Sequence, residues 1–174
     1  MAALAYELLD ATGPRALSDA ARRIGLVTHP GISAFQAASA AAGALIGHDF
    51  CCVSLSDLLT PRAAILQRLT AAAEGDFVTA LYNPRSQRRT DLIEHTRTLF
   101  LAHRPPQTPV VIASSLGRPA QNVRVVTLET FDPTEIDMLT IVLIGASTSR
   151  LVERGEGLRT YTPRGYANKH PEGA

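Results

Sequence analysis

The chain has 174 residues, of which 45% are apolar and 19% charged, and its net charge at pH 7 is +1. These values exclude a disordered or fibrous chain and a surface that captures nucleic acid or membrane by overall charge. The length accommodates one sizeable core, or one full domain plus part of another. No apolar run is long enough to cross a bilayer and no basic leader opens the chain, which predicts a cytoplasmic protein.

The first third of the chain predicts two helices and a strand. Residues 1–11 are typical of a helix that ends before Gly13 and Pro14, although no capping residue precedes it. Residues 24–28 predict a short strand. Ser33 is a good N-cap for a helix of small residues that ends at Gly43, and the alanines in it indicate close packing.

The remainder alternates strands with helices. A strand is expected at 50–55, followed by a helix that Thr60 and Pro61 open and Gly75 ends. After a strand at 77–82, Ser86 is expected to cap a helix that turns Leu92, Thr96, Leu99 and Phe100 inward. Three further strands are expected, at 110–114, 123–128 and 139–145. Apolar runs alternating with helices predict an α/β fold with a mostly parallel sheet flanked by helices.

Candidate ligand contacts lie where the predicted strands end. In open α/β sheets, ligands bind beyond the carboxyl ends of the strands. The segments 83–84, 114–117 and 145–148 follow strands and combine small residues with hydrogen-bonding side chains. Turn composition alone explains any one of them. The three together favour a binding site.

The common catalytic and phosphate-binding motifs are absent, as is any histidine pair at metal-ligand spacing, so no metal is expected. His48 and Asp49, at the entry to a strand, form the one acid/base candidate. The alternative interpretation is a surface loop with a locally satisfied imidazole.

Arginines gather after the strand at 77–82. Arg88 and Arg89 fall in the predicted first helical turn, where positive charge opposes the helix dipole. With Arg85, and with Arg62 at the start of another helix, they suit fork-like binding of carboxylates or phosphates. The alternative is a solvated charged face.

Four stretches resemble one enzyme family in order and spacing over nearly the whole chain: PGISAFQAASAAAGALIGHDFCCVSLSDLLTP, AAAEGDFVTALYNPRSQRR, EIDMLTIVLIGAS and YTPRGY. HDFCCVSLSDLL and LYNPRS resemble the precorrin-3B C(17)-methyltransferase branch of the tetrapyrrole methylases, and PGIS with its alanine-rich helix resembles the wider family. The resemblance implies a two-domain α/β homodimer that binds S-adenosylmethionine between its domains. It also implies methyl transfer to carbon 17 of precorrin-3B, or its cobalt form, with ring contraction in cobalamin biosynthesis.

The resemblance starts part of the way into the family pattern. The first strand with its glycine-proline loop and the later Gly-Asp loop of the family are not found. We therefore expect residues 1–47 to be the remnant of an N-terminal α/β domain, 48–169 a complete C-terminal methylase domain, and 170–174 a tail.

The resemblance also implies roles for individual residues. The macrocycle carries acetate and propionate arms, for which Arg85, Arg88 and Arg89 are the expected partners. His48 and Asp49 would assist acyl chemistry during ring contraction. The residues expected to bind the cofactor are Pro30, Ser33, Ala34, Leu81, Tyr82, Asn83, Ser115, Leu116, Gly145 and Ala146.

Three function classes remain open at this point. The first is a methyltransferase completed by another segment or chain, with a tetrapyrrole substrate and neither nucleic acid nor membrane as partner. The second is a non-catalytic module that binds a tetrapyrrole or mediates dimerisation. The third, a nucleotide or phosphate-ester binding protein, is disfavoured because phosphate-cradling loops are absent.

Overall fold

The computed structural model describes residues 2–86, 89–155 and 157–166, which fall into two compact units, 1–32 and 33–174. The first unit contains α1 (Ala2–Asp10), the short 3-10 helix η1 (Gly13–Arg15) and α2 (Asp19–Arg22). No described residue of these elements is buried. In neither unit do the described residues include a helix with the length and apolar character needed to cross a membrane.

The helix expected at the start of the chain is confirmed, and the strand expected at 24–28 is wrong. Residues 25–33 form no helix or strand, and Ile24 and Val27 are exposed. A strand needs a neighbour to pair its backbone groups, and this segment has none among the described residues.

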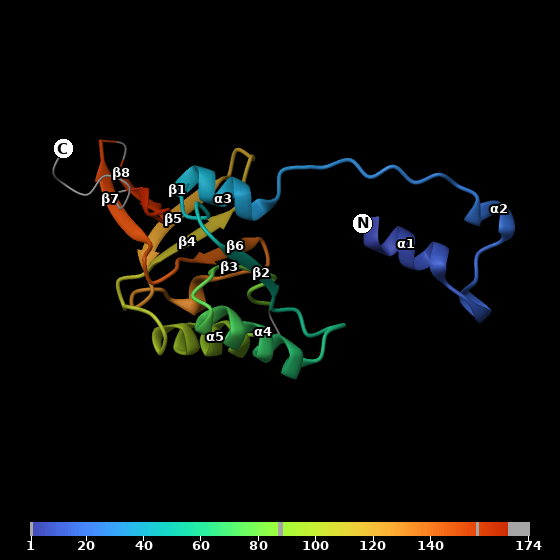
Figure 1. The fold of residues 1–174 in the computed structure, drawn as a ribbon, viewed down its shortest axis with the longest axis horizontal. Helices are drawn as coiled ribbons and strands as arrows, with labels where there is room; N and C mark the ends of the chain where they lie inside the picture. The colour runs from blue at the N-terminus through green and yellow to red at the C-terminus, as the bar shows by residue number, and fades with distance from the viewer. Residues whose placement is uncertain (1, 87–88, 156, 167–174) are drawn as a thin grey trace. The chain divides into compact units, whose positions relative to one another are not determined.

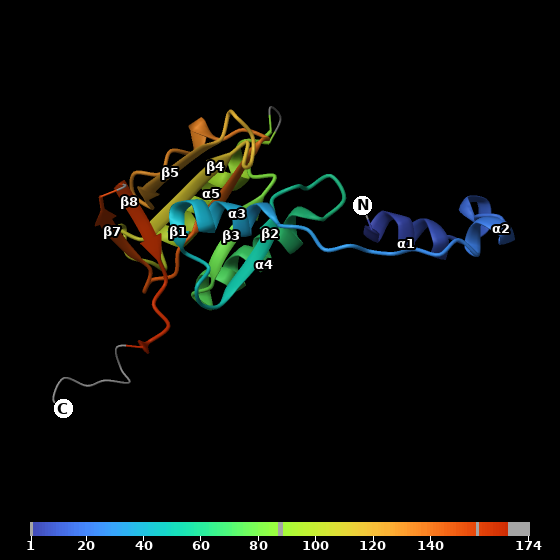
Figure 2. The ribbon, with the colours of Figure 1, turned by 90° about the horizontal axis from the view of Figure 1, so that it is seen from above.

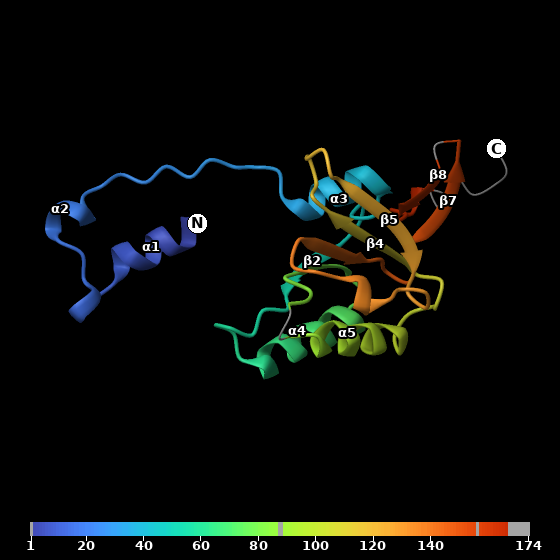
Figure 3. The same cartoon turned by 180° about the vertical axis from the view of Figure 1, so that it is seen from behind.

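A five-stranded sheet forms the centre of the second unit, with the order β2-β3-β6-β4-β5. Helix α3 packs on one face, while α4 and α5 lie on the other (Figure 1). Figure 3 shows the same layers from behind. The α/β class with helices on both faces is confirmed. The bounds are α3 (Ala34–Ala42), β2 (Phe50–Ser54), α4 (Arg62–Glu74), β3 (Val78–Tyr82), α5 (Asp91–Leu101), β4 (Pro109–Ser114), β5 (Asn122–Thr127), η2 (Pro133–Glu135) and β6 (Thr140–Ile144).

The sheet is mixed, so the expectation of mostly parallel strands is wrong. β2 and β3 are parallel, whereas β6 runs antiparallel to both of its neighbours and β5 antiparallel to β4. β3, β4 and β6 read as continuous apolar runs because helices cover both faces of the sheet. Burial on two faces produces that pattern whichever way a strand runs.

The beginning and end of α3 follow directly from the sequence. Ser33 caps the helix as expected, and its backbone N–H donates to Oε1 of Gln36 at 3.0 Å, in a capping box. The helix ends at Gly43, whose φ is +134°. A Cβ at that position would overlap the carbonyl oxygen of Thr160, so only glycine fits.

That close approach builds a second, three-stranded sheet that the sequence did not predict. β1 (Gly43–Ala44) pairs parallel with β8 (Gly157–Tyr161), which pairs antiparallel with β7 (Arg150–Arg154). Figure 2 shows these strands beyond the end of α3. The hydroxyl of Thr162 donates to the carbonyl of Leu45 at 2.6 Å and so links the residues that follow β8 and β1.

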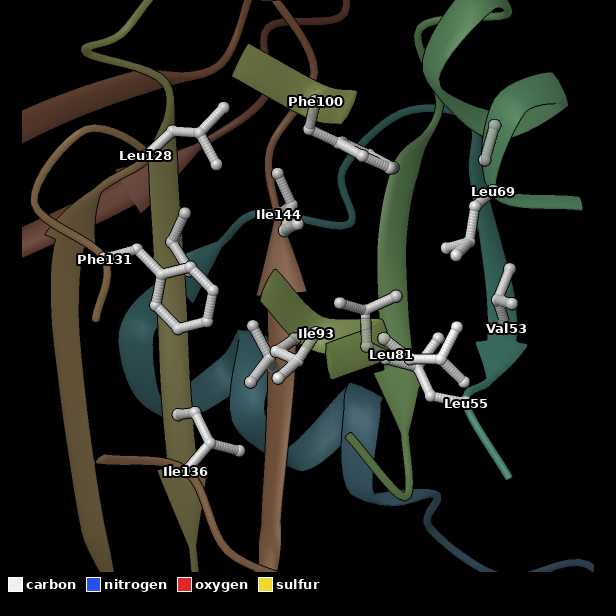
Figure 4. Packing of buried hydrophobic residues seen from close by; sticks show 14 of the residues in the cluster. Val53, Leu55, Leu69, Leu81, Ile93, Phe100, Leu128, Phe131, Ile136 and Ile144 are labelled. Atoms are coloured by element: carbon white, nitrogen blue, oxygen red, sulfur yellow. The ribbon is translucent and has the colours of Figure 1, made fainter. Parts of the chain in front are cut away.

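The larger core lies between the sheet and the α4–α5 layer. Side chains from both layers meet there, among them Leu69, Leu81, Ile93, Phe100 and Ile144 (Figure 4). Leu92, Thr96 and Phe100 point inward from α5 as expected, and Leu99 packs at the edge of the core. Burying each large apolar side chain contributes roughly 1.5–3 kcal/mol.

Candidate functional site

A pocket of about 280 Å³ lies where β3 and β4 end, and we call it the strand-end pocket. Antiparallel β6 separates these two strands and starts at the edge where they end, since Ser114 pairs with Thr140 and Leu81 with Val142. The pocket is therefore built from two strand ends, one strand start and the beginning of α3. It is lined by Ala34, Tyr82, Asn83, Ala113, Ser115, Leu116, Arg118, Met138, Leu139, Thr140 and Ile141.

Two residues of this pocket hold an unusual backbone conformation. Asn83 has φ +48° and Ser115 has φ +51°, both in the left-handed region that non-glycine residues seldom adopt. The side-chain amide of Asn83 donates to Oγ of Ser54 at 3.1 Å and supports one of the two turns. Such conformations cost about 1–3 kcal/mol each and gather at functional sites.

Five of the ten residues expected to bind the cofactor line this one pocket: Ala34, Tyr82, Asn83, Ser115 and Leu116. The hydroxyl of Tyr82 accepts a hydrogen bond from the backbone N–H of Phe35 at 3.4 Å, which links the end of β3 to the first turn of α3.

Three other expected cofactor residues lie elsewhere. Leu81 is fully buried in the core on the α4–α5 side of the sheet, because side chains alternate along β3. Ser33 caps α3 and does not line the pocket, and Pro30 belongs to the first unit.

Gly145 and Ala146 lie at the opposite edge of the sheet, so the expectation that they share a pocket with Tyr82 and Ser115 is wrong. The reason is the direction of β6, which ends beside the starts of β3 and β4. The backbone N–H of Gly145 donates to Pro109 O at 2.8 Å. A side chain at Gly145 would collide with Ser149, which gives this glycine a packing role.

His48 and Asp49 form a pair, but they are also at this opposite edge. Nδ1 of His48 is 3.3 Å from Oδ2 of Asp49, and both side chains are largely open to solvent. They line a cavity of about 770 Å³ together with Ala146, Arg150 and other residues, and this cavity shares no residue with the strand-end pocket. The described geometry thus separates the acid/base candidates from the pocket that collects the cofactor candidates.

The helix expected to follow an N-cap at Ser86 begins four residues later, so the placement of Arg89 in a first helical turn is wrong. α5 starts at Asp91 with Thr90 at its N-cap, and Asp91 and Glu94 occupy its first turn, where acids suit the helix dipole. The Ser86 hydroxyl instead accepts a hydrogen bond from the backbone N–H of Arg89 at 3.1 Å.

Of the described arginines, Arg62 and Arg89 line one pocket, while Arg85 lies beside it in another. Nη1 of Arg85 donates to the carbonyl of Pro133 at 2.9 Å, and Arg62 is paired with Asp91. Hydrogen bonding to Arg62 holds the pKa of the Asp91 carboxyl below its ordinary value. Arg88 lies outside the described residues.

Arg89 is the buried member of this group, with 8% of its side chain exposed. Its Nη2 donates to the carbonyl of Asn83 at 2.8 Å, and its Nη1 lies 3.4 Å from Oδ1 of Asp57. Arg89 therefore supports the left-handed turn that shapes the strand-end pocket.

Sequence reasoning missed the wall of the pocket that β6 supplies. Met138, Leu139 and Thr140 line it, and the first two are exposed despite being large and apolar. The apolar pair ahead of the β6 strand was a usable signal. Met138 and Leu139 were not assigned to this pocket because a parallel β6 would have placed them at the edge of the sheet where β3 and β4 begin.

The pocket suits part of an S-adenosyl group. Its wall is mainly apolar, with hydroxyl and amide groups from Tyr82, Asn83, Ser115 and Thr140. A volume of about 280 Å³ falls just below the roughly 300–1,000 Å³ of pockets that enclose a whole small molecule. Among the described residues, no group of three or more metal-binding side chains occurs.

Comparison with known proteins gives one consistent family. The pattern of the tetrapyrrole (corrin/porphyrin) methylases matches residues 6–132. A precorrin-3B C(17)-methyltransferase of Sinorhizobium is 42% identical over 147 residues, which are 84% of this chain and 58% of that protein. A cobalt-factor III methyltransferase of Priestia megaterium is 39% identical over 170 residues, 98% of this chain and 30% of that protein.

Solved structures agree with this result. The crystal structure of the methyltransferase CobJ superposes with a TM-score of 0.70 at 41% identity, covering 77% of this chain and 54% of that one. The structure of the cobalt precorrin-4 methyltransferase CbiF, with a TM-score of 0.51 at 20% identity, shares the fold. The chain thus spans less than two thirds of the length of each of these relatives.

Proposed function

Because the chain belongs to the tetrapyrrole (corrin/porphyrin) methylase family, we propose that it forms part of an S-adenosylmethionine-dependent methyltransferase of cobalamin biosynthesis. The proposed reaction is methylation of carbon 17 of precorrin-3B, or its cobalt form, with ring contraction. The observation that carries the proposal is that five residues expected to bind the cofactor line one pocket.

In this proposal the strand-end pocket holds one side of the cofactor. S-adenosylmethionine supplies a sulfonium methyl group, which a nucleophilic carbon takes by in-line displacement as S-adenosylhomocysteine leaves. The chain's own part is positioning: Tyr82, Asn83 and Ser115 orient the donor, while Met138 and Leu139 exclude water. No acid/base group is needed for the displacement, which accords with the distance of His48 and Asp49 from the pocket.

The remaining assignments belong to the same proposal. The boundary expected between residues 47 and 48 does not agree with the fold, because α3 packs on the five-stranded sheet and β1 pairs with β8. We therefore propose that residues 1–32 belong to an N-terminal domain and residues 33–169 to the C-terminal domain. A second segment would cover the part of the cofactor that the strand-end pocket does not hold, because the volume of this pocket is small for a whole cofactor. We also propose a cytoplasmic homodimer. Arg85, Arg88 and Arg89 are proposed to meet the carboxylate arms of the substrate. The acyl chemistry expected of His48 and Asp49 is not part of the proposal, because both line the cavity at the opposite edge of the sheet.

Calorimetric titration with S-adenosylhomocysteine tests the assignment of the pocket. Ala34 lines the pocket at the start of α3, so Ala34→Trp fills it, whereas Ala40→Trp on the exposed side of the same helix does not. We expect the unaltered chain and Ala40→Trp to bind alike and Ala34→Trp to bind at least about tenfold more weakly, a loss of roughly 1.4 kcal/mol. Absence of binding by the unaltered chain, or equal binding by both variants, would contradict the proposal.

A further inference from the structure

A second and larger pocket adjoins the strand-end pocket, and we call it the arginine pocket. Its volume is about 720 Å³, and it shares Asn83 and Met138 with its neighbour. It is built by the loop after β2, the loop after β3 and the first turns of α4 and α5. The lining residues that bear on its chemistry are Asp57, Leu58, Arg62, Ser86, Arg89 and Asp91.

Arg89 is the group in this pocket with unused hydrogen-bonding capacity. A guanidinium carries five N–H donors in a rigid fork. Two are used, one on the carbonyl of Asn83 and one on Oδ1 of Asp57, and the buried Nε has no hydrogen-bond partner among the described residues. Arg62, in contrast, is committed to Asp91.

The carboxylate that faces Arg89 holds it loosely. Oδ1 of Asp57 lies 3.4 Å from Nη1, beyond the 2.7–2.9 Å of a strong charge-assisted bond. Asp57 is about one third exposed, whereas Arg89 is buried. An incoming carboxylate could therefore take the place of Asp57, which would turn toward water at little cost.

The rim of the pocket offers apolar surface beside this cation. Leu58 is 84% exposed and Met138 is 53% exposed, and both line the pocket. A ligand with a flat apolar body and a carboxylate arm matches the combination of an apolar rim and a buried guanidinium.

We propose that the arginine pocket binds one carboxylate arm of the macrocycle and that this arm replaces Asp57 on Arg89. The inference rests on the proposed function and adds a specificity device to it. Asp57 is a built-in competitor: it neutralises Arg89 in the free protein and lets only a carboxylate with better geometry displace it. The side chain of Arg89 then joins the two pockets, because it holds Asn83 at the same time.

The test uses coproporphyrin, a porphyrin with four carboxylates, titrated at pH 7 and followed by its visible absorption. Asp57→Asn keeps the shape of the competitor and removes its charge, so it is expected to bind the probe roughly three- to tenfold more tightly. Arg89→Gln is expected to bind it at least about tenfold more weakly. Arg124→Gln is the matched control, because Arg124 on β5 forms an exposed ion pair with Glu135 of η2 and does not line the arginine pocket, and it is expected to leave the affinity unchanged.

The gain in Asp57→Asn separates this proposal from a structural role, since a damaged fold weakens binding. Unchanged or weaker binding by Asp57→Asn would overturn the exchange, even if Arg89→Gln failed to fold. Titration of the same variants with S-adenosylhomocysteine distinguishes a failure of this inference from a failure of the proposed function. If the unaltered chain binds the cofactor but the variants all bind the porphyrin equally well, only this inference is overturned. If the unaltered chain does not bind the cofactor, the proposed function is overturned.

Discussion

The two edges of the five-stranded sheet each hold a buried arginine, and the two arginines are bonded in different ways. At the edge where β6 ends, the side chain of Arg104 is fully buried and donates to the carbonyls of Gly145, Ala72 and Phe77. At the edge where β6 begins, Arg89 donates to one carbonyl, faces a loosely held carboxylate and lines a large pocket.

Arg104 lines none of the pockets described above, although its Nε, like that of Arg89, has no hydrogen-bond partner among the described residues. Its Nε lies 3.4 Å from Asp76, and its guanidinium stacks 4.3 Å from the centre of the Phe100 ring. Burial lowers the pKa of Arg104 to about 10, so it remains a cation at neutral pH. Burial of an arginine alone therefore does not indicate a binding site. An arginine indicates a site when its unused N–H donors face a pocket.

The largest expected effect is at the edge where β6 ends. Arg104→Gln leaves buried carbonyls without donors and Asp76 without its cation, and it is expected to lower the free energy of unfolding by about 3–5 kcal/mol. Urea unfolding followed by circular dichroism measures this. Arg124→Gln, which removes an exposed pair, should cost no more than about 1 kcal/mol. Equal losses in the two variants would contradict the structural role of Arg104.

The next effect concerns the junction between the two sheets. Gly43→Ala places a Cβ against the carbonyl of Thr160 at a φ of +134°, and we expect a loss of about 1–3 kcal/mol in the free energy of unfolding. Gly25→Ala, at a position with open space around it and an ordinary backbone, is the control and should change the stability little. A thermal melt of both variants that showed no difference would argue against the close approach of β1 and β8.

A smaller effect is expected at the edge where β6 begins. Asn83→Ala loses the bond to Ser54 and places a less tolerant residue at φ +48°, at a cost of about 1–2 kcal/mol. Asn83→Gly loses the same bond but adopts that conformation freely, so it should be the more stable of the two. Urea unfolding ranks them, and the reverse order would mean that the left-handed turn is not formed in solution.

The smallest effect is a pH dependence. The pKa of Asp91 is lower in the folded chain than in the unfolded chain, so its contribution is present above the unfolded pKa of about 4 and is lost as the pH falls through the folded value. Because this pair is exposed, the contribution is small. Asp91→Asn should therefore show a slightly flatter loss of stability below pH 4. If Asp91→Asn and the unaltered chain lost stability in the same way below pH 4, the lowered pKa of Asp91 would be contradicted.

The sequence predicted local features better than long-range ones. The capping of α3 by Ser33, its end at Gly43 and the inward face of α5 depend on neighbouring residues and were correct. The direction of β6 depends on a pairing that spans some 60 residues from β3, and apolar runs do not encode it. That one error moved Gly145 and Ala146 to the wrong edge and hid Met138 and Leu139. Arg89 was found as a cation, but its burial and its partner Asp57 required the structure.

Hydrogen exchange with and without S-adenosylhomocysteine tests the central claim most directly, because it reads the two edges in one experiment. We expect slower exchange in residues 82–83, 113–118 and 138–141, where the strand-end pocket lies, and unchanged exchange in residues 145–149 at the opposite edge. Protection confined to residues 145–149 and to His48 and Asp49 would contradict the central claim, since the cofactor would then occupy the cavity at the other edge of the sheet.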